Sequence, residues 1–403
     1  MAIINVQRAV YHANAETTLK RDVDESMLKL EPDAAPLWVL TNQAKKRSPS
    51  VAPKFEWFED AEAPLWGQVT ATAYATAATD IWVVDATIFA VDDLVIVPKA
   101  TGSGVSAVDE ILLVTAITGT SNGTLTVTRN VGGAGGDTIP SASPLRILGQ
   151  ACVEGSAFPS VRSTQKVPKA SYCQYFRTPI KTTEIMEATE AFAVPEGERN
   201  YQRGVSLVRH RSEIEAAGLW GQGSESLAAA GSRWTTKGVK PTISTNITDF
   251  STTLTYTAML QFGEKGFRFG EKQKLCMAGP SILSAFDFFS ANKILTSVED
   301  TVFGVAIKKI VSNHGTYMIA NNFRMEAGIA GAAGFNDELY LIDLPSVTMR
   351  YLAGNCKNLN TKLYENVIQD GSARTVDEYR SMVGWQIRHE KKHGRGYNVT
   401  AFA

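Results

Sequence analysis

Apolar and polar positions follow a helical period in one long stretch near the middle of the chain. From Glu198 to Trp220, apolar and small residues recur at steps of three and four, whereas the arginines lie largely off that stripe. The stripe consists of Tyr201, Val205, Val208, Ser212, Ala216 and Leu219. Pro195 and Glu196 favour a helix start before it, and Gly221 favours a stop after it. We predict a helix with one buried face, roughly 35 Å long.

A period of two dominates an earlier region, between residues 68 and 150. Short β-prone runs are separated there by Gly, Ser, Thr and Asp. The runs are Asp80–Val84, Leu94–Val97, Glu110–Thr115, Leu125–Thr128 and Leu145–Leu148. Their number and length predict a compact β-barrel or sandwich. The Gly132–Asp137 stretch has no helix after it, so we interpret it as a flexible loop and not as a phosphate cradle.

The part that follows the long helix mixes both periods. Leu254–Phe262 and Pro280–Asn292 are predicted helices. Predicted strands are Lys274–Ala278, Val302–Val311, Thr316–Ala320, Leu339–Leu344, Val347–Leu352 and Asn360–Val367, before a long mixed segment at Val376–His389 and a basic tail. The turn residues Ser312–Gly315 make two of these strands a predicted hairpin. This half is therefore predicted to be α+β.

Residues 1 to about 65 are predicted to form an extended arm. Glu31–Pro36 interrupts any helix, and prolines recur at positions 49 and 53. The arm carries large apolar side chains that it cannot bury by itself, and we take six residues as candidate assembly contacts: Leu37, Trp38, Phe55, Trp57, Phe58 and Trp66. They predict that the arm lies against another domain or a neighbouring subunit. An ordinary strand-rich extension is the alternative.

Composition and charge narrow the classes of function. With 403 residues, 44% of them apolar, the chain can build two or three domains with a core in each. Its 40 Lys and Arg against 41 Asp and Glu disfavour a dedicated nucleic-acid binder but allow a wall that encloses DNA.

The cysteines form no Cys-x-x-Cys pair, so free thiols are expected at Cys152, Cys173, Cys276 and Cys356. Without a signal peptide or a long apolar run, we expect cytoplasmic synthesis and no membrane partner.

Motifs that could carry catalysis stand in the wrong context. Gly119–Gly123 fits Gly-x-Ser-x-Gly, but a second strand follows it, so we predict a turn at Ser121. His389 and His393 are the only close pair of histidines, and the lysines between them disfavour a cation, so we interpret them as solvated tail residues. Acidic residues ahead of the long helix predict a solvated or intersubunit face: Glu184, Glu187, Glu190, Glu196 and Glu198. We predict no catalytic residue, no cofactor site and no metal site.

The order of these pieces resembles the major capsid proteins of tailed bacteriophages with the Hong Kong 97-type fold. It is similar to the branch that carries a β-barrel insertion between the arm and the long helix. The residues that carry the resemblance are Glu31–Leu37, Phe55–Asp60, Asp109–Val114, Leu125–Arg129, Tyr172–Phe176, Ile214, Glu215, Gly221 and Glu378–Gly394. The resemblance therefore touches most of the chain.

The resemblance implies an α+β capsid fold with an inserted small β-barrel. The implied parts are an arm and the start of an extended loop at 1–67, the barrel at 68–150, the return of the loop at 151–194, the spine helix of a peripheral domain at 195–240, a mainly axial domain at 241–340, and completing strands at 341–403. The implied function is a non-enzymatic virion subunit whose hexamers and pentamers enclose double-stranded DNA. Its expected partners are copies of itself, a portal, and scaffolding or decoration proteins.

Two other interpretations remain open. An encapsulin-like compartment would share the fold but enclose protein cargo. A carbohydrate-binding barrel of an adhesin is suggested by Trp82 and the many threonines, although Trp82 lies in an apolar strand and is predicted to pack in a core. An enzyme would depend on Ser121 alone.

Overall fold

The computed structural model divides the chain into two compact units. One comprises Met1–Trp57 with Lys169–Ala403, and the other comprises Phe58–Pro168. The described residues are 35–43, 46–98, 109–133, 138–156, 162–189, 197–228, 231–292, 298–302, 305–322, 324–325, 334–354, 357–368 and 371–402. Predictions that fall on Glu31–Ala34, Glu190, Pro195, Glu196, Cys356 and residues 134–137 lie outside them.

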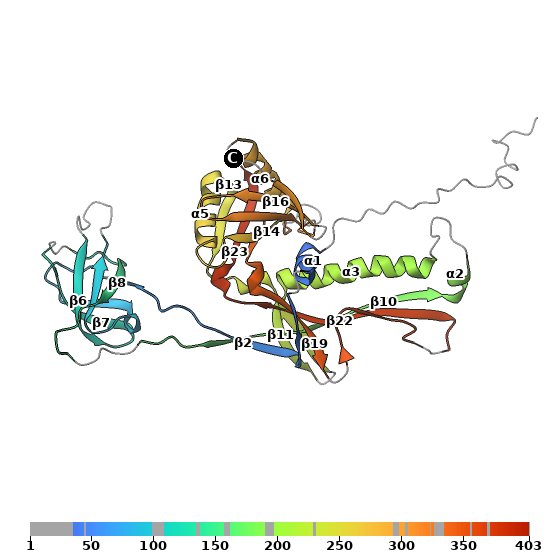
Figure 1. The fold of residues 1–403 in the computed structure, drawn as a ribbon, viewed down its shortest axis with the longest axis horizontal. Helices are drawn as coiled ribbons and strands as arrows, with labels where there is room; N and C mark the ends of the chain where they lie inside the picture. Colours follow the sequence, from blue (N-terminus) through green and yellow to red (C-terminus); the bar gives the residue numbers. More distant parts are fainter. Residues whose placement is uncertain are drawn as a thin grey trace, which may run out of the picture. The chain divides into compact units, whose positions relative to one another are not determined.

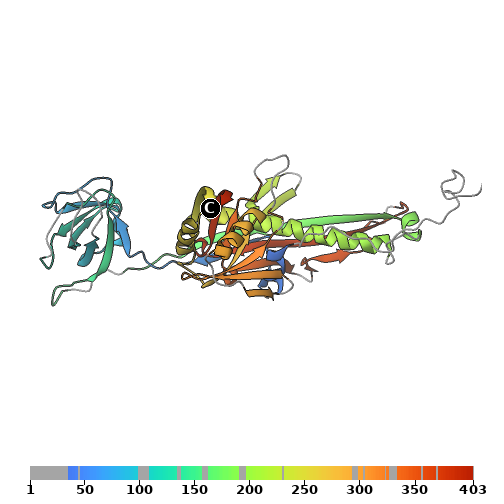
Figure 2. The same ribbon diagram turned by 90° about the horizontal axis from the view of Figure 1, so that it is seen from above.

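A six-stranded sheet and one long helix form the first part of the larger unit (Figure 1). The sheet runs in the order β1 (Arg47–Ser50), β19 (Val347–Gly354), β22 (Arg374–Ile387), β10 (Gln174–Thr183), with β20 (Lys357–Asn358) on β19 and β21 (Lys362–Tyr364) on β22. Strands β10 and β22 pair antiparallel along the whole of β10, and the segment predicted as mixed is this one strand β22. We call the long antiparallel pair of β10 and β22 the ribbon. Helix α3 (Glu198–Trp220) runs beside this ribbon in both Figure 1 and Figure 2.

The predicted bounds of the long helix are confirmed, but its predicted buried face is wrong. Of the expected stripe only Leu219 is buried, and Val205 is exposed. The buried positions of α3 are His210, Ile214, Glu215, Gly218 and Leu219. Two of these residues are ionisable, so counting apolar residues shifted the predicted face around the helix axis.

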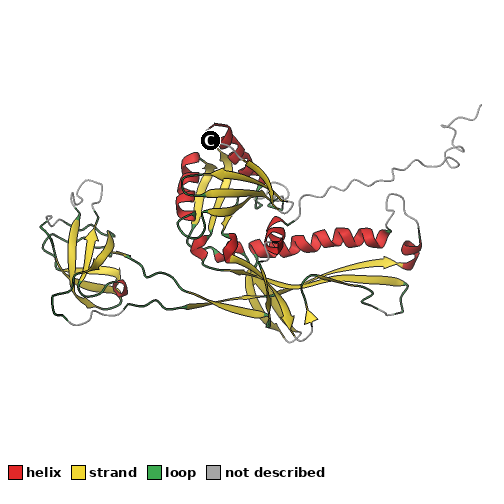
Figure 3. Cartoon of the chain, in the orientation of Figure 1, coloured by secondary structure: helices red, strands yellow, loops and turns green. Residues whose placement is uncertain are grey.

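A seven-stranded mixed sheet forms the second part of the larger unit. Its order is β13 (Ile247–Leu254), β23 (Gly394–Phe402), β18 (Leu339–Ile342), β14 (Gln273–Ala278), β17 (Thr316–Asn321), β16 (Val305–Val311), β15 (Val298–Val302). Helices α5 (Tyr256–Gly266) and α6 (Pro280–Asn292) pack in the core on one side of it (Figure 3). Cys276 of β14 belongs to that core, whereas Leu275 and Met277 belong to the core on the opposite face. Burial on both faces explains why residues 275–278 of β14 and the whole of β18 are apolar or aromatic.

Most predicted elements of this half are confirmed, and one observed strand is not among the predicted ones. Strands β16 and β17 form the predicted antiparallel hairpin, closed by hydrogen bonds between Ser312 and Gly315. The hydrophobic pattern predicts no element for the basic tail. That tail forms strand β23, which pairs parallel with β13 and antiparallel with β18. Hydrogen bonding in the interior of the sheet holds this segment despite its charge.

Short elements complete the larger unit. Helix α1 (Pro36–Gln43) precedes β1, α2 (Glu184–Ala188) follows β10, and α4 (Val239–Thr242) precedes β13. Strand β11 (Gln222–Ala228) pairs with β12 (Gly231–Lys237). Strand β2 (Lys54–Glu59) pairs with β9 (Val167–Tyr172), and both strands cross the bounds of the unit, at Trp57–Phe58 and at Pro168–Lys169. Single 3-10 turns lie at Ala86–Ile88, in the smaller unit, and at Leu344–Ser346 and Glu390–Lys392.

The smaller unit is a six-stranded antiparallel sheet with its own core. Its order is β3 (Trp66–Gln68), β8 (Pro144–Gln150), β5 (Asp93–Val97), β6 (Glu110–Thr118), β7 (Ser121–Thr128), β4 (Asp80–Asp85). All five predicted runs are strands, and a Val69–Val83 bridge connects the segment after β3 to β4. Trp82 is 52% exposed, so its predicted core packing is wrong. Alternation along β4 turns Ile81 and Val83 inward and Trp82 outward.

We predict opposite effects for two Gly-to-Ala substitutions in α3. A Cβ at Gly218 would lie 2.6 Å from the indole of Trp385, whereas a Cβ at Gly204 would meet nothing within 4 Å. Gly204→Ala should therefore raise the free energy of unfolding by about 0.5–1 kcal/mol through helix propensity. Gly218→Ala should lower it by about 1–3 kcal/mol through overpacking. Urea unfolding measures both, and equal effects at the two positions would contradict this packing.

Candidate assembly site

The six predicted assembly residues fall into two groups. Leu37, Trp38 and Phe55 are buried within the chain, Trp57 is partly buried, Phe58 is 71% exposed and Trp66 is 43% exposed. For the buried residues the structure supports the first alternative, packing against another part of the same chain. Contact with a neighbouring subunit remains a prediction for Phe58 and Trp66.

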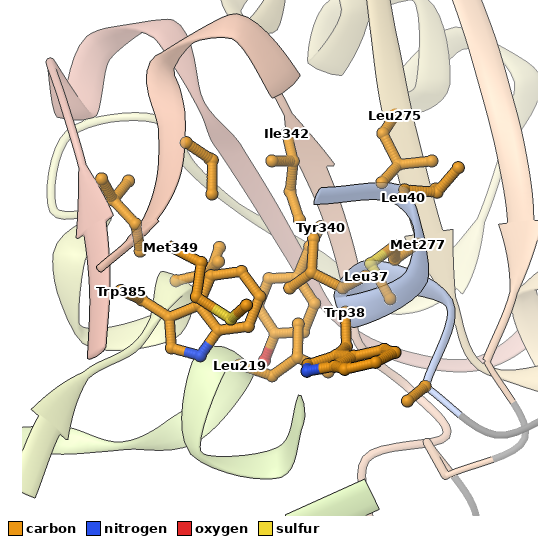
Figure 4. Packing of buried hydrophobic residues seen from close by; sticks show 14 of the residues in the cluster. Leu37, Trp38, Leu40, Leu219, Leu275, Met277, Tyr340, Ile342, Met349 and Trp385 are labelled. Carbon is orange, nitrogen blue, oxygen red and sulfur yellow. The ribbon is translucent and has the colours of Figure 1, made fainter. Parts of the chain in front are cut away.

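Helix α1 brings Leu37 and Trp38 into the core between the two sheets of the larger unit. The arm is therefore not extended from Pro36 to Gln43, and that prediction is wrong. Proline suits the first position of a helix, because its missing N–H would have no partner there. Figure 4 shows Leu37, Trp38 and Leu40 in one cluster with side chains from both sheets and from α3: Leu219, Leu275, Met277, Tyr340, Ile342, Met349 and Trp385.

A buried carboxyl group anchors the start of α1. Glu215 of α3 accepts the backbone N–H of Trp38 at 3.2 Å on one oxygen, and the amide of Asn322 at 2.7 Å on the other. The first N–H groups of a helix have no partner within it, so this carboxyl supplies a cap from another element. Burial raises the pKa of Glu215 to about 8, against the opposing effect of these hydrogen bonds. The guanidinium of Arg211, also on α3, lies 4.7 Å from the centre of the Trp38 ring.

The other end of α3 is tied to β22 by ion pairs. Asp377, of which 1% of the side chain is exposed, accepts hydrogen bonds from Arg199 at 2.7 Å and from Arg203 at 2.8 Å. Burial alone would raise the pKa of Asp377. The hydrogen bonds from Arg199, the Asn366 backbone and Arg203 outweigh it and lower the pKa to about 2. Ion pairs thus hold the N-terminal end of α3 to β22, whereas Glu215 near its C-terminal end holds α1 and Asn322.

Between these ends, His210 bridges the helix to both strands of the ribbon. Its Nδ1 lies 2.8 Å from Thr178 Oγ1 on β10, and its Nε2 lies 2.6 Å from Ser381 Oγ on β22. Burial lowers the pKa of this imidazole, which favours its neutral form. The sequence signal for this residue is its position four residues before Ile214 on the same face.

The chemically suggestive sequence motifs take no part in this site. His389–His393 matches the letters of a His-Glu-x-x-His motif, but His389 is left-handed, with φ 53°, and a 3-10 turn follows it. His393 is fully buried, so its interpretation as a solvated tail residue is wrong. Its Nδ1 accepts the Asp343 N–H at 3.2 Å, and its Nε2 lies 3.3 Å from the Arg388 carbonyl. Both ring nitrogens therefore have protein partners.

Ser121 and the acidic cluster are also accounted for by local structure. Ser121 begins β7 after a turn at Gly119, where φ is +84°, and this confirms the predicted turn. Among the described acidic residues, Glu187 accepts the Thr182 hydroxyl at 2.8 Å, and Glu198 accepts the Gln202 amide at 2.7 Å. In these contacts the partner of each carboxylate is a hydroxyl or an amide, and not the second carboxylate that a pair for general acid–base catalysis would require.

The cysteines, the possible metal ligands and the helices of the described residues can be compared with the sequence predictions. Cys152, Cys173 and Cys276 are free thiols, as predicted. In the part of the chain that the structure describes, no group of three or more His, Cys, Asp or Glu could hold a metal ion. None of the described helices has the length and apolar character needed to cross a membrane.

A family model and a solved structure match almost the whole chain. A family model described as SU10 major capsid protein matches residues 6–400. A chain from the capsid of an empty GTA particle has a TM-score of 0.52 and 8% identity, and the match covers 98% of this chain and 100% of that one. That likeness shows a capsid-like fold of mixed α+β type, built mostly of sheets.

Two further solved structures are less similar. A chain of Microbacterium phage Oxtober96 has a TM-score of 0.45 and 10% identity, and the match covers 97% of this chain and 99% of that one. The holo-SrpI encapsulin complex of Synechococcus elongatus has a TM-score of 0.42 and 9% identity, over 59% of this chain and 78% of that one. None of the curated proteins matches the chain by sequence.

Glu215 should give the fold a measurable dependence on pH. The folded chain keeps this proton up to about pH 8, whereas the unfolded chain releases it near the ordinary value of 4.5. The folded state binds more protons in that window, so stability falls as the pH rises from about 5 to 8. Glu215→Gln should flatten this part of the pH profile of urea unfolding. Glu213→Gln, the same substitution at a side chain 40% exposed on the same helix, is the control, and equal flattening by the two variants would contradict the assignment.

Asp377 should contribute a second dependence at acid pH. Its folded pKa lies below the ordinary 3.8, so its contribution is complete above about pH 4 and is lost as the pH falls towards 2. Asp377→Asn should lower the free energy of unfolding at pH 7 by about 2–3 kcal/mol, because two arginines lose a buried partner. Acid unfolding monitored by circular dichroism tests this, with Asp287→Asn at an exposed ion pair as control. Equal losses in the two variants would contradict the assignment.

Proposed function

Because this chain belongs to the SU10 major capsid protein family and is thereby a structural subunit of an icosahedral phage shell, we propose that its hexamers and pentamers build that shell and that its smaller unit is an inserted β-barrel. The family match over residues 6–400 carries the conclusion. It favours a phage head over an encapsulin-like compartment or an adhesin. The virion capsid is therefore the location of the protein.

The proposed barrel is supported by the bonding of its edge strands. The Thr70 N–H donates to the Trp82 carbonyl, and the Val69–Val83 bridge joins the same two segments. A closed sheet leaves no unpaired edge to aggregate, which suits a protein that must assemble only through defined contacts. The chain enters and leaves this unit from the larger one, at Phe58 and Pro168, as an insertion requires.

The remaining predicted parts fit the larger unit as follows. We assign α3 and the six-stranded sheet to the peripheral domain, and the seven-stranded sheet with α5 and α6 to the axial domain. Residues 394–402 then complete the axial sheet rather than a separate tail. The compact unit at Phe58–Pro168 is wider than the proposed barrel at 68–150, so its flanks belong to the extended loop.

Function in a shell subunit resides in the sum of many weak contacts. Exposed Phe58 supports such a contact, because a large apolar side chain is seldom left 71% accessible, and Trp38 and Phe55 of the same arm are buried. With 40 basic and 41 acidic residues, the wall would enclose double-stranded DNA without sequence-specific binding. Synthesis in the host cytoplasm and contacts with a portal, scaffolding or decoration proteins belong to the same proposal.

Assembly of the purified chain tests this function. Electron microscopy and sedimentation at several concentrations should reveal closed shells, or rings of five and six subunits. A monomer at every concentration would count against self-assembly.

Phe58→Ser should reduce the yield of shells several-fold and leave the melting temperature of the subunit unchanged. Val153→Ser removes an equally exposed apolar side chain from the smaller unit and serves as the control. Equal yields from the two variants would exclude Phe58 as an assembly contact.

A further inference from the structure

The outward face of the smaller unit is apolar where a solvated sheet would be polar. In β5 and β6 the residues Val95 and Leu112 point into the core, and their neighbours in sequence point outward and are only partly buried. On a sheet with one wet face, those outward positions are normally polar. Six apolar side chains stand at outward positions of β5, β6 and the neighbouring strands β3 and β8, which also carry Gln68, Arg146 and Gln150 on their exposed side. We call the six the outer patch: Trp66, Leu94, Ile96, Ile111, Leu113 and Leu148.

The strand register makes the outer patch continuous. Strands β3, β8, β5 and β6 are neighbours in that order. Trp66 pairs with Arg146, Arg146 with Ile96, and Ile96 with Ile111, so these residues form one row across the sheet. Leu94 pairs with Leu113 in the next row, and Leu148 is the bulged residue of β8 between the partners of Leu94 and Val95. Cross-strand neighbours of this kind are about 5 Å apart, so their side chains form one surface.

The sheet itself does not require this composition. The adjoining strand β7 carries Thr124, Thr126 and Thr128 at its outward positions, and β7 pairs along β6. Threonine has the same preference for strands as the branched apolar residues. Apolar side chains therefore stand at outward positions from β3 to β6, and again at Trp82 and Val84 of β4, with the threonines of β7 between them. The apolar residues from β3 to β6 indicate contact with something other than water.

Charge and area indicate what covers the patch. Arg146 lies 5.3 Å from the centre of the Trp66 ring, and no carboxylate stands at an outward position of the four strands in the described residues. Six partly exposed side chains offer on the order of 400 Å². A stable complex needs about 800 Å² on each partner. The patch is therefore too small to hold a free partner but sufficient where neighbours are already held close.

We propose that the outer patch is an interface between two copies of this chain that forms only in the assembled shell. The inference rests on the proposed function, because only a shell of many copies supplies the required proximity. The contact would bury Trp66 and Leu148, the most exposed members of the patch at 43% and 52%. It adds to the contact at Phe58, which lies outside the patch.

Solvent protection of the wild-type protein tests this without any substitution. Hydroxyl-radical labelling of Trp66 and Leu148 should fall at least about threefold from dissociated subunits to purified shells, since half-exposed side chains become buried. Val91 is 43% exposed on the same unit outside the patch and should be labelled equally in both states. Because purified shells contain only this chain, another protein cannot cause the protection. Equal labelling of Trp66 and Leu148 in both states would overturn the proposal.

A pair of substitutions tests the energetic role of the patch. Leu94→Thr with Leu148→Thr should raise roughly tenfold the concentration at which half of the chain is in shells, with Val91→Thr as the matched control. Variant shells that form like those of the control would overturn the proposal while leaving the proposed function intact. Absence of shells from the wild-type chain would instead refute the proposed function, and with it this interface.

Discussion

The fold depends on one shared apolar core, in which the two sheets of the larger unit meet. Met349 and Trp385 reach it from the six-stranded sheet, and Leu275 and Tyr340 from the seven-stranded sheet. Leu37 of α1 completes it. Because each sheet buries large side chains in the same place, neither can turn without opening a cavity, which costs several kcal/mol for residues of this size. A stiff subunit is what a shell under internal load requires.

Polar groups then fix how α3 lies on this core. Glu215 caps α1, His210 bridges two strands, and Asp377 pairs with two arginines. Apolar packing alone tolerates sliding along a helix, whereas buried polar groups lose their partners if it slides. The three contacts therefore set the register of the helix, and two of them would respond to pH in opposite directions. Buried polar contacts thus fix the interior of the larger unit, whereas the smaller unit exposes the apolar side chains of the outer patch.

The sequence predicts those helices and strands whose period and end residues lie within the segment itself. Glu198–Trp220 and Pro280–Asn292 were predicted within their true bounds, because helical period and end signals lie in the segment itself. Helix α1 and strand β23 were missed, since both are held by residues far away in sequence. Trp82 shows the same limit: a period-two pattern finds the strand, but which of its faces is covered depends on the partner. The assembly residues were predicted as a class, and only the structure separates buried Trp38 from exposed Phe58.

Strand pairing between distant parts of the chain has a consequence for when folding can finish. Strand β1 pairs in parallel with β19, Arg47 opposite Met349, and β13 pairs in parallel with β23, Ile247 opposite Arg395. Such contacts close loops of very long sequence separation, which slows folding and places it late. During synthesis the first half of the chain must wait for the last strands before either sheet is complete. A nascent subunit therefore cannot complete either sheet before β19 and β23 have been synthesised, and shorter chains present no finished surface to a growing shell.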